Sequence, residues 1–284
     1  MGGGAWGVVP RHLIDPWYRA IFVRRSVRAY DGRPVGREAI GEIRELLDGF
    51  SPLCEGARAV LLEEGAQEIL SGTVGSIGKI QGAGAVVVFI ADKSHPQWQA
   101  AAGYLGEGII LHATSLGLGT CWVAGTYKRS EARRRIALSV SESIVAVTPL
   151  GRPAAAESAG AQVIRAVAGS HKRKPLETLT RGVAADQWRL GCREALEAAR
   201  LAPSAANRQP WQFGVMPDRV VVRASGPDLM PVVPNRLDCG IVMLHLEVGA
   251  RAHGLEGSWT FLQRPLVAEY VFEPAGDPDH QART

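Results

Sequence analysis

The pattern of apolar and polar positions predicts helices interleaved with a few short strands. Two stretches, 101–116 and 239–253, are apolar nearly all round a helix, which is typical of a helix buried in a core. The other predicted helices are 16–22, 37–47, 130–137 and 186–200. The predicted strands are 57–62, 85–91, 143–150, 212–216, 219–224 and 266–273. This order predicts an α+β fold with mixed sheets around central buried helices.

The two buried helices belong to a repeat that aligns without a gap. Residues 103–122 align with 240–259 at a constant offset, since 240 − 103 and 259 − 122 both equal 137. Each copy is an apolar helix that ends at a glycine, Gly117 or Gly254, and then reaches a tryptophan. Glycine suits the left-handed position that follows a helix end. Chance similarity between two buried helices is the alternative.

A second pair of segments supports the repeat. Residues 47–52 and 198–203 both end a helical stretch with a turn that contains proline. A unit of this size is too long for a solenoid repeat. We therefore expect two homologous half-domains in one chain, 1–180 and an abbreviated 181–284, with the crossover between them at 151–170.

Composition and charge fit a globular protein and exclude several classes of partner. Apolar residues make up 46% of the chain and charged residues 21%, which allows a substantial core. The net charge is +4 and most basic residues are dispersed, so we expect no nucleic-acid partner. No secretory signal is visible, and the longest apolar runs are too short to span a bilayer. We expect a soluble, cytoplasmic protein with no membrane partner.

The cysteines and histidines do not indicate a metal site. The four cysteines lack metal-like spacing, so we expect reduced thiols and no bound metal; they are Cys54, Cys121, Cys192 and Cys239. His112 and His245 lie on the two apolar helices. There a histidine satisfied within the core or at an interface is a better interpretation than a ligand.

Residues 24–30 form a basic arm that suits a ligand carrying both a phosphate and a ring. Arg24, Arg25 and Arg28 bring three guanidinium groups, and Ser26 adds a hydroxyl. Arginine pairs with phosphate through two parallel hydrogen bonds and stays charged at any working pH. If the arm is extended, Arg24, Ser26 and Arg28 project to one side. A solvated basic segment is the alternative.

The loop between Pro203 and Pro210 is a second candidate binding segment. Each proline disfavours helix in the residue before it, so both ends of the loop are constrained. The loop contains three small residues and two amides: Ser204, Ala205, Ala206, Asn207 and Gln209. The small residues would let backbone N–H groups approach a flat ligand, and the amides offer both donors and acceptors. A plain helix–strand connection is the alternative.

Two further segments carry weaker signals. The segment 116–125 leaves the first buried helix and ends in Val123, Ala124 and Gly125, which a helix stop followed by a core tryptophan does not explain. The segment 171–176 is basic and includes His171 and Arg173. A solvated linker is its alternative.

These four segments, taken in order, resemble those of the nitroreductase-like FMN-dependent oxidoreductases, in particular the fused pseudo-dimer type described as TM nitroreductases. The resemblance covers nearly all of residues 20–260. It implies FMN as cofactor, with Arg24, Ser26 and Arg173 at its phosphate and ribityl chain and Arg28 beside N1 and O2 of its ring. It also implies backbone contact near flavin N5. The remaining implied cofactor contacts are Arg25, Val123, Ala124, Gly125, His171, Pro203, Ser204, Ala205, Asn207 and Gln209.

The resemblance implies one complete site. In the homodimeric family the arm of one subunit and the loop of the other meet at each flavin. Here the arm occurs only in the first half and the intact loop only in the second, where no second arm is found. In the first half, residues 52–56 stand in place of the loop and have lost its polar pattern. We therefore expect a monomeric pseudo-dimer with a single FMN.

The resemblance implies an FMN-dependent NAD(P)H oxidoreductase. It would reduce an electron-poor small molecule, such as a nitroaromatic or a quinone, by a ping-pong hydride mechanism. The cofactor carries the chemistry, so no side chain need be a catalytic acid or base, and Arg28 tunes the flavin. Two alternatives stay open at this point. One is a non-redox protein that binds, stores or senses FMN, with one degenerate site; the other is a structural protein without a cofactor.

Overall fold

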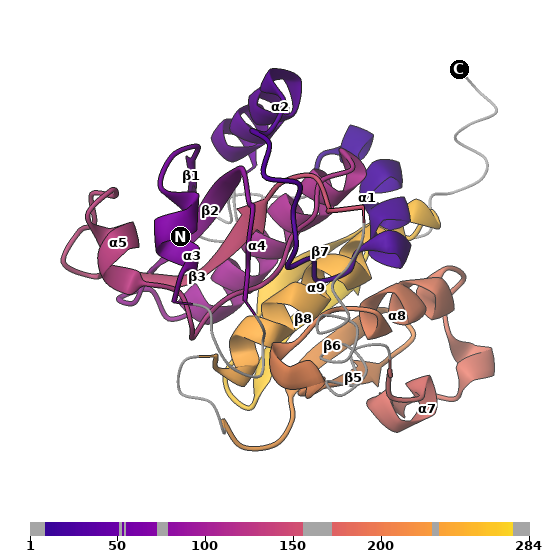
Figure 1. The fold of residues 1–284 in the computed structure, drawn as a ribbon. Coiled ribbons are helices and arrows are strands. Elements are labelled where there is room, and N and C mark those ends of the chain that lie inside the picture. Colours follow the sequence, from indigo (N-terminus) through magenta and orange to yellow (C-terminus); the bar gives the residue numbers. More distant parts are fainter. Residues whose placement is uncertain are drawn as a thin grey trace.

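The computed structural model describes residues 9–50, 53, 55–72, 79–155, 172–228 and 233–274. Its longer helices are α1 (Arg11–Val23), α2 (Arg37–Gly49), α4 (Trp98–Ser115), α8 (Cys192–Arg200) and α9 (Asn235–Ala252) (Figure 1). Its shorter helices are α3 (Ala66–Leu70), α5 (Arg129–Arg133), α7 (Leu176–Leu179) and the 3₁₀ turns η1 (Ala185–Gln187) and η2 (Ala205–Asn207). Its strands are β1 (Ala57–Leu62), β2 (Ala85–Asp92), β3 (Glu142–Leu150), β4 (Thr180–Gly182), β5 (Trp211–Val215), β6 (Arg219–Ala224), β7 (Gly257–Phe261) and β8 (Leu266–Phe272).

Within the described residues the strands form two sheets, one on either side of two central helices. The three-stranded sheet has the order β1-β2-β3, and α4 packs against it. The five-stranded sheet has the order β4-β5-β6-β8-β7, and α9 packs against it. All pairings are antiparallel except that of β4 with β5. The fold is therefore α+β, as the sequence predicts.

Strand β2 is buried on both faces, and its period-two alternation divides the core. Val87, Phe89 and Ala91 belong to the large core that also contains α4 and α9. Val86, Val88 and Ile90 point the other way, into a smaller cluster with α3. Successive side chains of a strand lie on opposite faces of its sheet, so one apolar run supplies both clusters.

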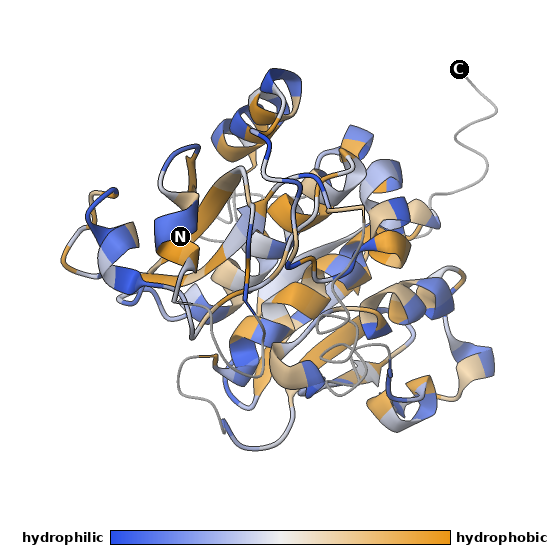
Figure 2. Ribbon diagram, viewed as in Figure 1, coloured by the Kyte–Doolittle hydropathy of each residue, from blue (hydrophilic) through white to orange (hydrophobic). Residues whose placement is uncertain are grey.

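The outer helices are amphipathic, in contrast to α4 and α9. In α2 the buried residues are Ile40, Ile43 and Leu46, which recur at helical spacing while the intervening positions are polar. Figure 2 shows both hydropathy colours on α2 and α8. In the described part of the chain no helix is long and apolar enough to cross a membrane.

Helices α4 and α9 approach each other closely at two glycines. A Cβ atom on Gly103 would lie 2.0 Å from the carbonyl oxygen of Leu237. Reciprocally, a Cβ on Gly240 would lie 2.0 Å from the carbonyl oxygen of Ala100. Gly103 and Gly240 are equivalent in the repeat, and so are Ala100 and Leu237, since 237 − 100 is also 137. Each helix makes the same contact with the other, which is the property of a twofold interface.

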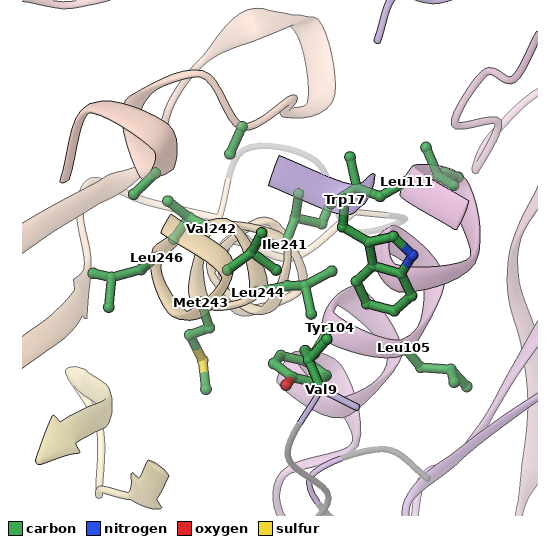
Figure 3. Close-up of a cluster of buried hydrophobic side chains, with 14 of the residues drawn as sticks. Val9, Trp17, Tyr104, Leu105, Leu111, Ile241, Val242, Met243, Leu244 and Leu246 are labelled. Atoms are coloured by element: carbon green, nitrogen blue, oxygen red, sulfur yellow. The ribbon is translucent and has the colours of Figure 1, made fainter. Parts of the chain in front are cut away.

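Larger side chains fill the space around this glycine contact. Figure 3 shows Tyr104 on α4 and Leu244 on α9, with Trp17 of α1 beside them. Trp17 and Tyr104 are fully buried, and the ring of Phe50 lies 5.3 Å from that of Trp17 and 6.0 Å from that of Tyr104. Helix α1 contacts both central helices and thereby joins the two sides of the core.

The ends of the two central helices are also alike. Leu118 N–H donates to the carbonyl of Ala113, and Leu255 N–H donates to that of Ala250, again 137 positions later. Gly117 and Gly254 have φ values of 77° and 73°, the left-handed conformation that the sequence predicts for both. The paired positions of the aligned segments thus make equivalent contacts in the two central helices.

Three predicted helices have bounds that differ from those of the structure. The predicted helix 186–200 is instead η1 followed by α8, because Gly191 adopts a φ of 84° and interrupts the helical path. Helix α1 begins at Arg11, so Pro16 lies inside it. The predicted helix 130–137 is also too long, since α5 ends at Arg133.

Strand β7 was not predicted from the sequence. Its alternating burial, in which Gly257 and Trp259 are buried between exposed neighbours, covers only five residues. The short elements α3, α7 and β4 were not predicted either.

We expect Gly240→Val to destabilise the protein by roughly 3 kcal/mol, because a branched side chain would force two backbones apart. Gly41→Ala is the matched control, since a Cβ there would meet nothing within 4 Å. In an exposed helical position this change stabilises by up to about 1 kcal/mol. Urea unfolding of both variants checks the expectation. Equal midpoints for Gly240→Val and wild type would show that the helices can separate without cost.

Candidate functional site

The basic arm is extended and lies beside the segment that follows α4. Val27 N–H donates to the carbonyl of Thr120 at 2.8 Å, and Ser26 forms a parallel bridge with Thr120. Val27 is buried, whereas Arg24, Ser26 and Arg28 are half-buried. This alternation agrees with the predicted common side of the arm. Arg25 is exposed.

Arg24 reaches a buried carboxylate between the two central helices. Its Nε lies 3.8 Å from Oε1 of Glu107, and the two side chains are 8% and 0% exposed. In the described part of the chain this Nε has no hydrogen-bond partner. Glu107 accepts a hydrogen bond from Trp122 Nε1 at 2.7 Å, and its Oε1 lies 2.9 Å from His245 Nε2. Arg24 is thus more enclosed than a simple phosphate contact on the surface would be.

Arg28 carries a second buried nitrogen that lacks a hydrogen-bond partner among the described residues. Its Nε is buried and makes no hydrogen bond to the described residues. Its guanidinium lies near Tyr30, whose pKa is raised well above 10.0 chiefly by burial, with Arg28 acting in the opposite direction. A buried donor without a partner costs free energy. A ligand that supplied acceptors to both Arg24 and Arg28 would remove that cost.

Arg173 brings a third guanidinium to the same region. Burial and then the charges of Arg24 and Arg200 lower the pKa of Arg173. Arg173 donates to Asn207 Oδ1 at 3.1 Å and to the carbonyl of Leu201 at 3.2 Å. Cations held this close favour an anion among them. The structure therefore brings together the arm and the basic segment, which are separated by almost 150 positions in the sequence.

The basic segment is bound to the 203–210 loop by amide hydrogen bonds. Gln209, which is 4% exposed, accepts from Lys174 N–H at 2.8 Å and donates to the carbonyl of Lys172 at 3.3 Å. Asn207 Nδ2 also donates to the carbonyl of Lys172, at 2.9 Å. In this conformation both amides connect two segments of the protein to each other. Contact of Asn207 and Gln209 with a ligand stays a prediction.

The backbone of the loop adopts an uncommon conformation. Ala206, Asn207 and Gln209 have φ values of 50°, 53° and 50°. The left-handed region is uncommon for residues other than glycine and costs of the order of 1–3 kcal/mol at each one. Ala206 is exposed at the tip of the loop. Such conformations gather at binding sites and persist only where the surroundings enforce them.

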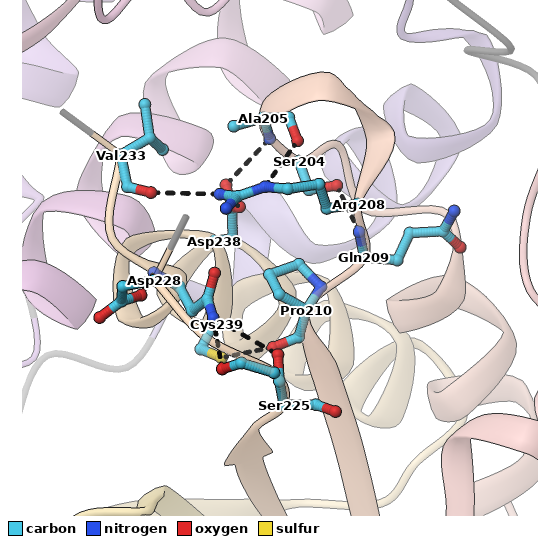
Figure 4. A network of polar contacts seen from close by, with 12 residues as sticks. Ser204, Ala205, Arg208, Gln209, Pro210, Ser225, Asp228, Val233, Asp238 and Cys239 are labelled. Atoms are coloured by element: carbon cyan, nitrogen blue, oxygen red, sulfur yellow. Dashed lines mark hydrogen bonds and ion pairs between the residues drawn. The ribbon is translucent and has the colours of Figure 1, made fainter. Parts of the chain in front are cut away.

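Asp238 on the first turn of α9 enforces this loop conformation (Figure 4). Its Oδ1 accepts from Ala205 N–H at 3.2 Å, and its Oδ2 accepts from Arg208 at 3.2 Å. Arg208 in turn donates to the carbonyl of Ala205. Gln209 N–H donates to the hydroxyl of Ser204 at 2.8 Å. Ala205 N–H is therefore directed at a carboxylate within the protein, although the sequence suggested that it could face a ligand.

Burial raises the pKa of Asp238 from 3.8 to about 7, against the opposing effects of Ala205 N–H and Arg208. Asp228 adds to the rise through its like charge. The group that holds the loop thus titrates near neutral pH.

The segment from Val123 to Gly125 continues the stretch that pairs with the arm at Thr120. Val123 is buried and exchanges two hydrogen bonds with Val147 of β3, so its N–H is engaged. Gly125 is exposed, and a Cβ atom there would meet nothing within 4 Å. The predicted open approach to the backbone thus exists at Gly125 and not at Val123.

Several predicted residues lie outside the described part of the chain. They are His171, at the start of the basic segment, and Pro52 and Cys54, in the segment 52–56. The remaining loop residue, Pro203, is half-buried.

The two helix histidines differ in how well they are satisfied. His245 contacts the carbonyl of Ala198 through Nδ1 at 3.1 Å as well as Glu107, so its interpretation as a satisfied interface histidine is confirmed. His112 Nδ1 accepts from Trp17 at 3.4 Å, whereas its Nε2 has no partner within the described residues. Burial lowers the pKa of His112.

Glu107, Asp238 and Arg208 were missed by sequence reasoning. One signal was available, because Glu107 is the single acidic or basic residue between Ala101 and Leu116, His112 aside. A charged side chain in the middle of a buried helix needs a partner. Asp238 and Arg208 gave no comparable signal, since they lie in polar surroundings in the sequence.

Comparison with known proteins relates the chain to a family and a fold. The model of a family described as "Putative TM nitroreductase" matches residues 17–250. A crystal structure titled a "putative nitroreductase" from Thermotoga maritima is 20% identical, with a TM-score of 0.61, over 91% of this chain and 94% of that one. This likeness shows a shared fold. A nitroreductase with bound FMN from Desulfitobacterium hafniense is 16% identical over 50% of this chain and 91% of that one, with a TM-score of 0.41. No curated protein matches the sequence.

The raised pKa of Asp238 predicts a pH dependence of stability. Between its ordinary pKa of 3.8 and its folded value of about 7, the folded protein binds a proton that the unfolded protein releases. The free energy of unfolding therefore falls as pH rises through this range. We expect Asp238→Asn to remove a fall of the order of 2 kcal/mol. Urea unfolding at pH 5 and pH 8 gives the free energy of unfolding of both proteins. An equal change of this free energy with pH in both would mean that Arg208 keeps Asp238 ionised throughout.

Proposed function

The chain belongs to the family described as "Putative TM nitroreductase", and from this premise we propose that it is an FMN-dependent oxidoreductase. It would use NAD(P)H to reduce an electron-poor small molecule such as a nitroaromatic or a quinone. The observation that carries the proposal is the pair of buried Nε atoms on Arg24 and Arg28, which lack hydrogen-bond partners within the described residues. They lie on the arm that borders Arg173 and the strained loop.

The residues present fit FMN by charge and by donor chemistry. Arg24 and Arg173 are close enough to repel each other, and a phosphate group between them would turn that repulsion into two attractions. Ser26 lies on the same arm and offers its hydroxyl to the ribityl chain. Arg28 is the cation available to the ring, and the open backbone at Gly125 would allow close approach of its edge. FMN would supply the acceptance and release of hydride.

We further propose that the protein is a fused pseudo-dimer with halves 1–180 and 181–284. The three-stranded sheet lies wholly before residue 180, and the five-stranded sheet begins at Thr180. The reciprocal contact of Gly103 and Gly240 supports this relation between the halves. The proposed site draws its arm from the first half and its loop from the second. No second arm occurs in the sequence, so a single FMN is expected.

A second candidate is an FMN-binding protein without turnover. The observation that favours it is the engagement of Asn207 and Gln209 with the basic segment, which leaves these amides committed to the protein in this conformation. In an FMN-binding protein of this kind, the loop would close the site and would not position a substrate. Reduction by nicotinamide separates the two candidates.

We expect purified protein to carry one FMN per chain and to lose its yellow absorbance when NAD(P)H is added without air. Released flavin, quantified against protein, gives the stoichiometry. Arg24→Ala and Arg173→Ala should each weaken FMN binding about tenfold or more, because each removes charged hydrogen bonds worth roughly 1.5–3 kcal/mol. Arg33→Ala, an exposed arginine paired with Asp31, is the control. Bound flavin that NAD(P)H cannot reduce would leave the non-redox candidate, and a ratio near two would refute the single site.

We expect Arg28→Gln to retain much of its FMN and to have a more negative reduction potential. A cation beside the flavin ring stabilises the reduced form more than the oxidised form, because reduction adds negative charge. If the reduced flavin loses about 1.4 kcal/mol of stabilisation relative to the oxidised flavin, the two-electron reduction potential falls by roughly 30 mV. Spectroelectrochemistry on the loaded variant measures the shift. A potential equal to wild type would show that Arg28 does not face the ring.

A further inference from the structure

A buried histidine–glutamate pair lies directly behind Arg24. His245 of α9 and Glu107 of α4 are both 0% exposed, and His245 Nε2 is 2.9 Å from Glu107 Oε1. The same carboxylate oxygen is 3.8 Å from Arg24 Nε. The pair thus joins the interface of the two central helices to the proposed FMN site.

Hydrogen-bond geometry fixes the number of protons on this pair. His245 Nδ1 faces the carbonyl of Ala198 at 3.1 Å, and a carbonyl can only accept, so Nδ1 bears a hydrogen. The contact of Nε2 with Glu107 needs a second proton between them. Glu107 accepts from Trp122 at its other oxygen and has Arg24 beside it, and both interactions favour the carboxylate. The second proton therefore belongs on His245.

We propose that His245 is a buried imidazolium ion, and that its proton is linked to the binding of an anionic ligand at Arg24. His245 and Glu107 act as positioning residues, since neither reaches the ligand directly. With His245 protonated, the charges of Arg24, Glu107 and His245 sum to +1. Loss of the proton brings the sum to zero and leaves a lone pair facing a carboxylate. The linkage to ligand binding rests on the proposed function, because FMN is the anionic ligand. The protonation of His245 rests only on the contacts of His245 and Glu107.

Further charged groups lie near Arg24 or on the helices that carry the pair. The arm contributes Arg24, the basic segment contributes Arg173, and the end of α8 contributes Arg200, which is paired with Glu197 at 2.6 Å. Helix α9 also carries Glu247, two residues beyond His245, whose own partners are the hydroxyl of Tyr104 and Arg251. Three of these groups are cations that would repel the proton, and an anionic ligand among them would offset that repulsion. By thermodynamic linkage the protonated protein must then bind the anion more tightly.

The second half of the molecule contains a matching carboxylate that lacks this linkage. Glu247 of α9 accepts from Trp259 Nε1 at 2.9 Å, as Glu107 does from Trp122. Its partner on the opposite helix is the hydroxyl of Tyr104, at 2.6 Å. Burial raises the pKa of Glu247. Its cation is Arg251, which lies next to Val9 and away from the arm. Glu247 therefore serves as an internal control.

The test compares FMN affinity over a range of pH in wild type, Glu107→Gln and Glu247→Gln. In Glu107→Gln the amide can accept from Trp122 and donate to a neutral His245, so the sum of charges is +1 without a proton shared between the two side chains. The affinities of wild type and this variant should agree near pH 5.5. They should diverge as pH rises, with wild type roughly tenfold weaker by about pH 8.5. The phosphate of FMN also titrates near pH 6, but equally in all three proteins.

Glu247→Gln should follow the wild-type curve, although it also removes a buried carboxylate. A constant ratio of wild type to Glu107→Gln across the range would overturn the linkage. So would the same divergence in Glu247→Gln. If wild type does not bind FMN at any pH, the proposed function and the linkage both fail.

A measurement without ligand decides the charge state by itself. Nitrogen NMR of histidine-labelled protein distinguishes an imidazolium from a neutral ring, and His245→Gln assigns the signal by its loss. We expect both ring nitrogens of His245 to be protonated in wild type at neutral pH and one in Glu107→Gln. A neutral His245 in wild type would overturn the proposal, whatever the outcome of the FMN titrations.

Discussion

The close approach of α4 and α9 is the constraint on which the rest of the structure depends. At Gly103 and Gly240 each backbone lies against the other with no room for a side chain. This contact sets the distance between the two sheets, because each central helix packs on its own sheet. It also brings Glu107 of one helix within hydrogen-bond distance of His245 of the other. The buried charges therefore owe their positions to two residues without side chains.

The candidate site is assembled from segments that are distant in the sequence and belong to both sides of this helix pair. Arg24 follows α1, Arg173 precedes α7, and Asn207 lies between α8 and β5. None of these segments forms a site alone, since the arm provides charge and the loop provides shape. The loop is held by Asp238 of α9, so its strained conformation is also anchored to the central helices.

The fold was predictable from sequence where long apolar patterns dominate. Strand β1 and the starts of α2 and β2 were predicted to the residue, and both central helices within four residues. The helices and β2 bury one or more whole faces, so their periodicity identifies them. The short strand β7 and the break at Gly191 were not identified, because five residues or one left-handed glycine change little in the pattern. Local residue preferences do not predict a conformation that tertiary contacts impose.

The site was predictable in its parts and not in its connections. Resemblance singled out Arg24, Arg28, Arg173 and Asn207, and the structure brings Arg173 to Asn207 and near Arg24. The ion pair of Arg24 with Glu107 depends on where α4 passes, which no local pattern encodes. The same holds for Asp238, whose partners Ala205 and Arg208 lie about 30 positions earlier.

The reciprocal glycine contact has a consequence for how such a protein can change. In a dimer of identical chains, one mutation at such a contact appears twice, because both sides of the interface have the same sequence. Here two separate codons specify Gly103 and Gly240, so each side can mutate alone while the other keeps its geometry. The segments around the glycine contact can likewise mutate separately. In the proposed pseudo-dimer, one half is free to lose its polar loop, and the other its basic arm, while the remaining loop and arm stay together under selection.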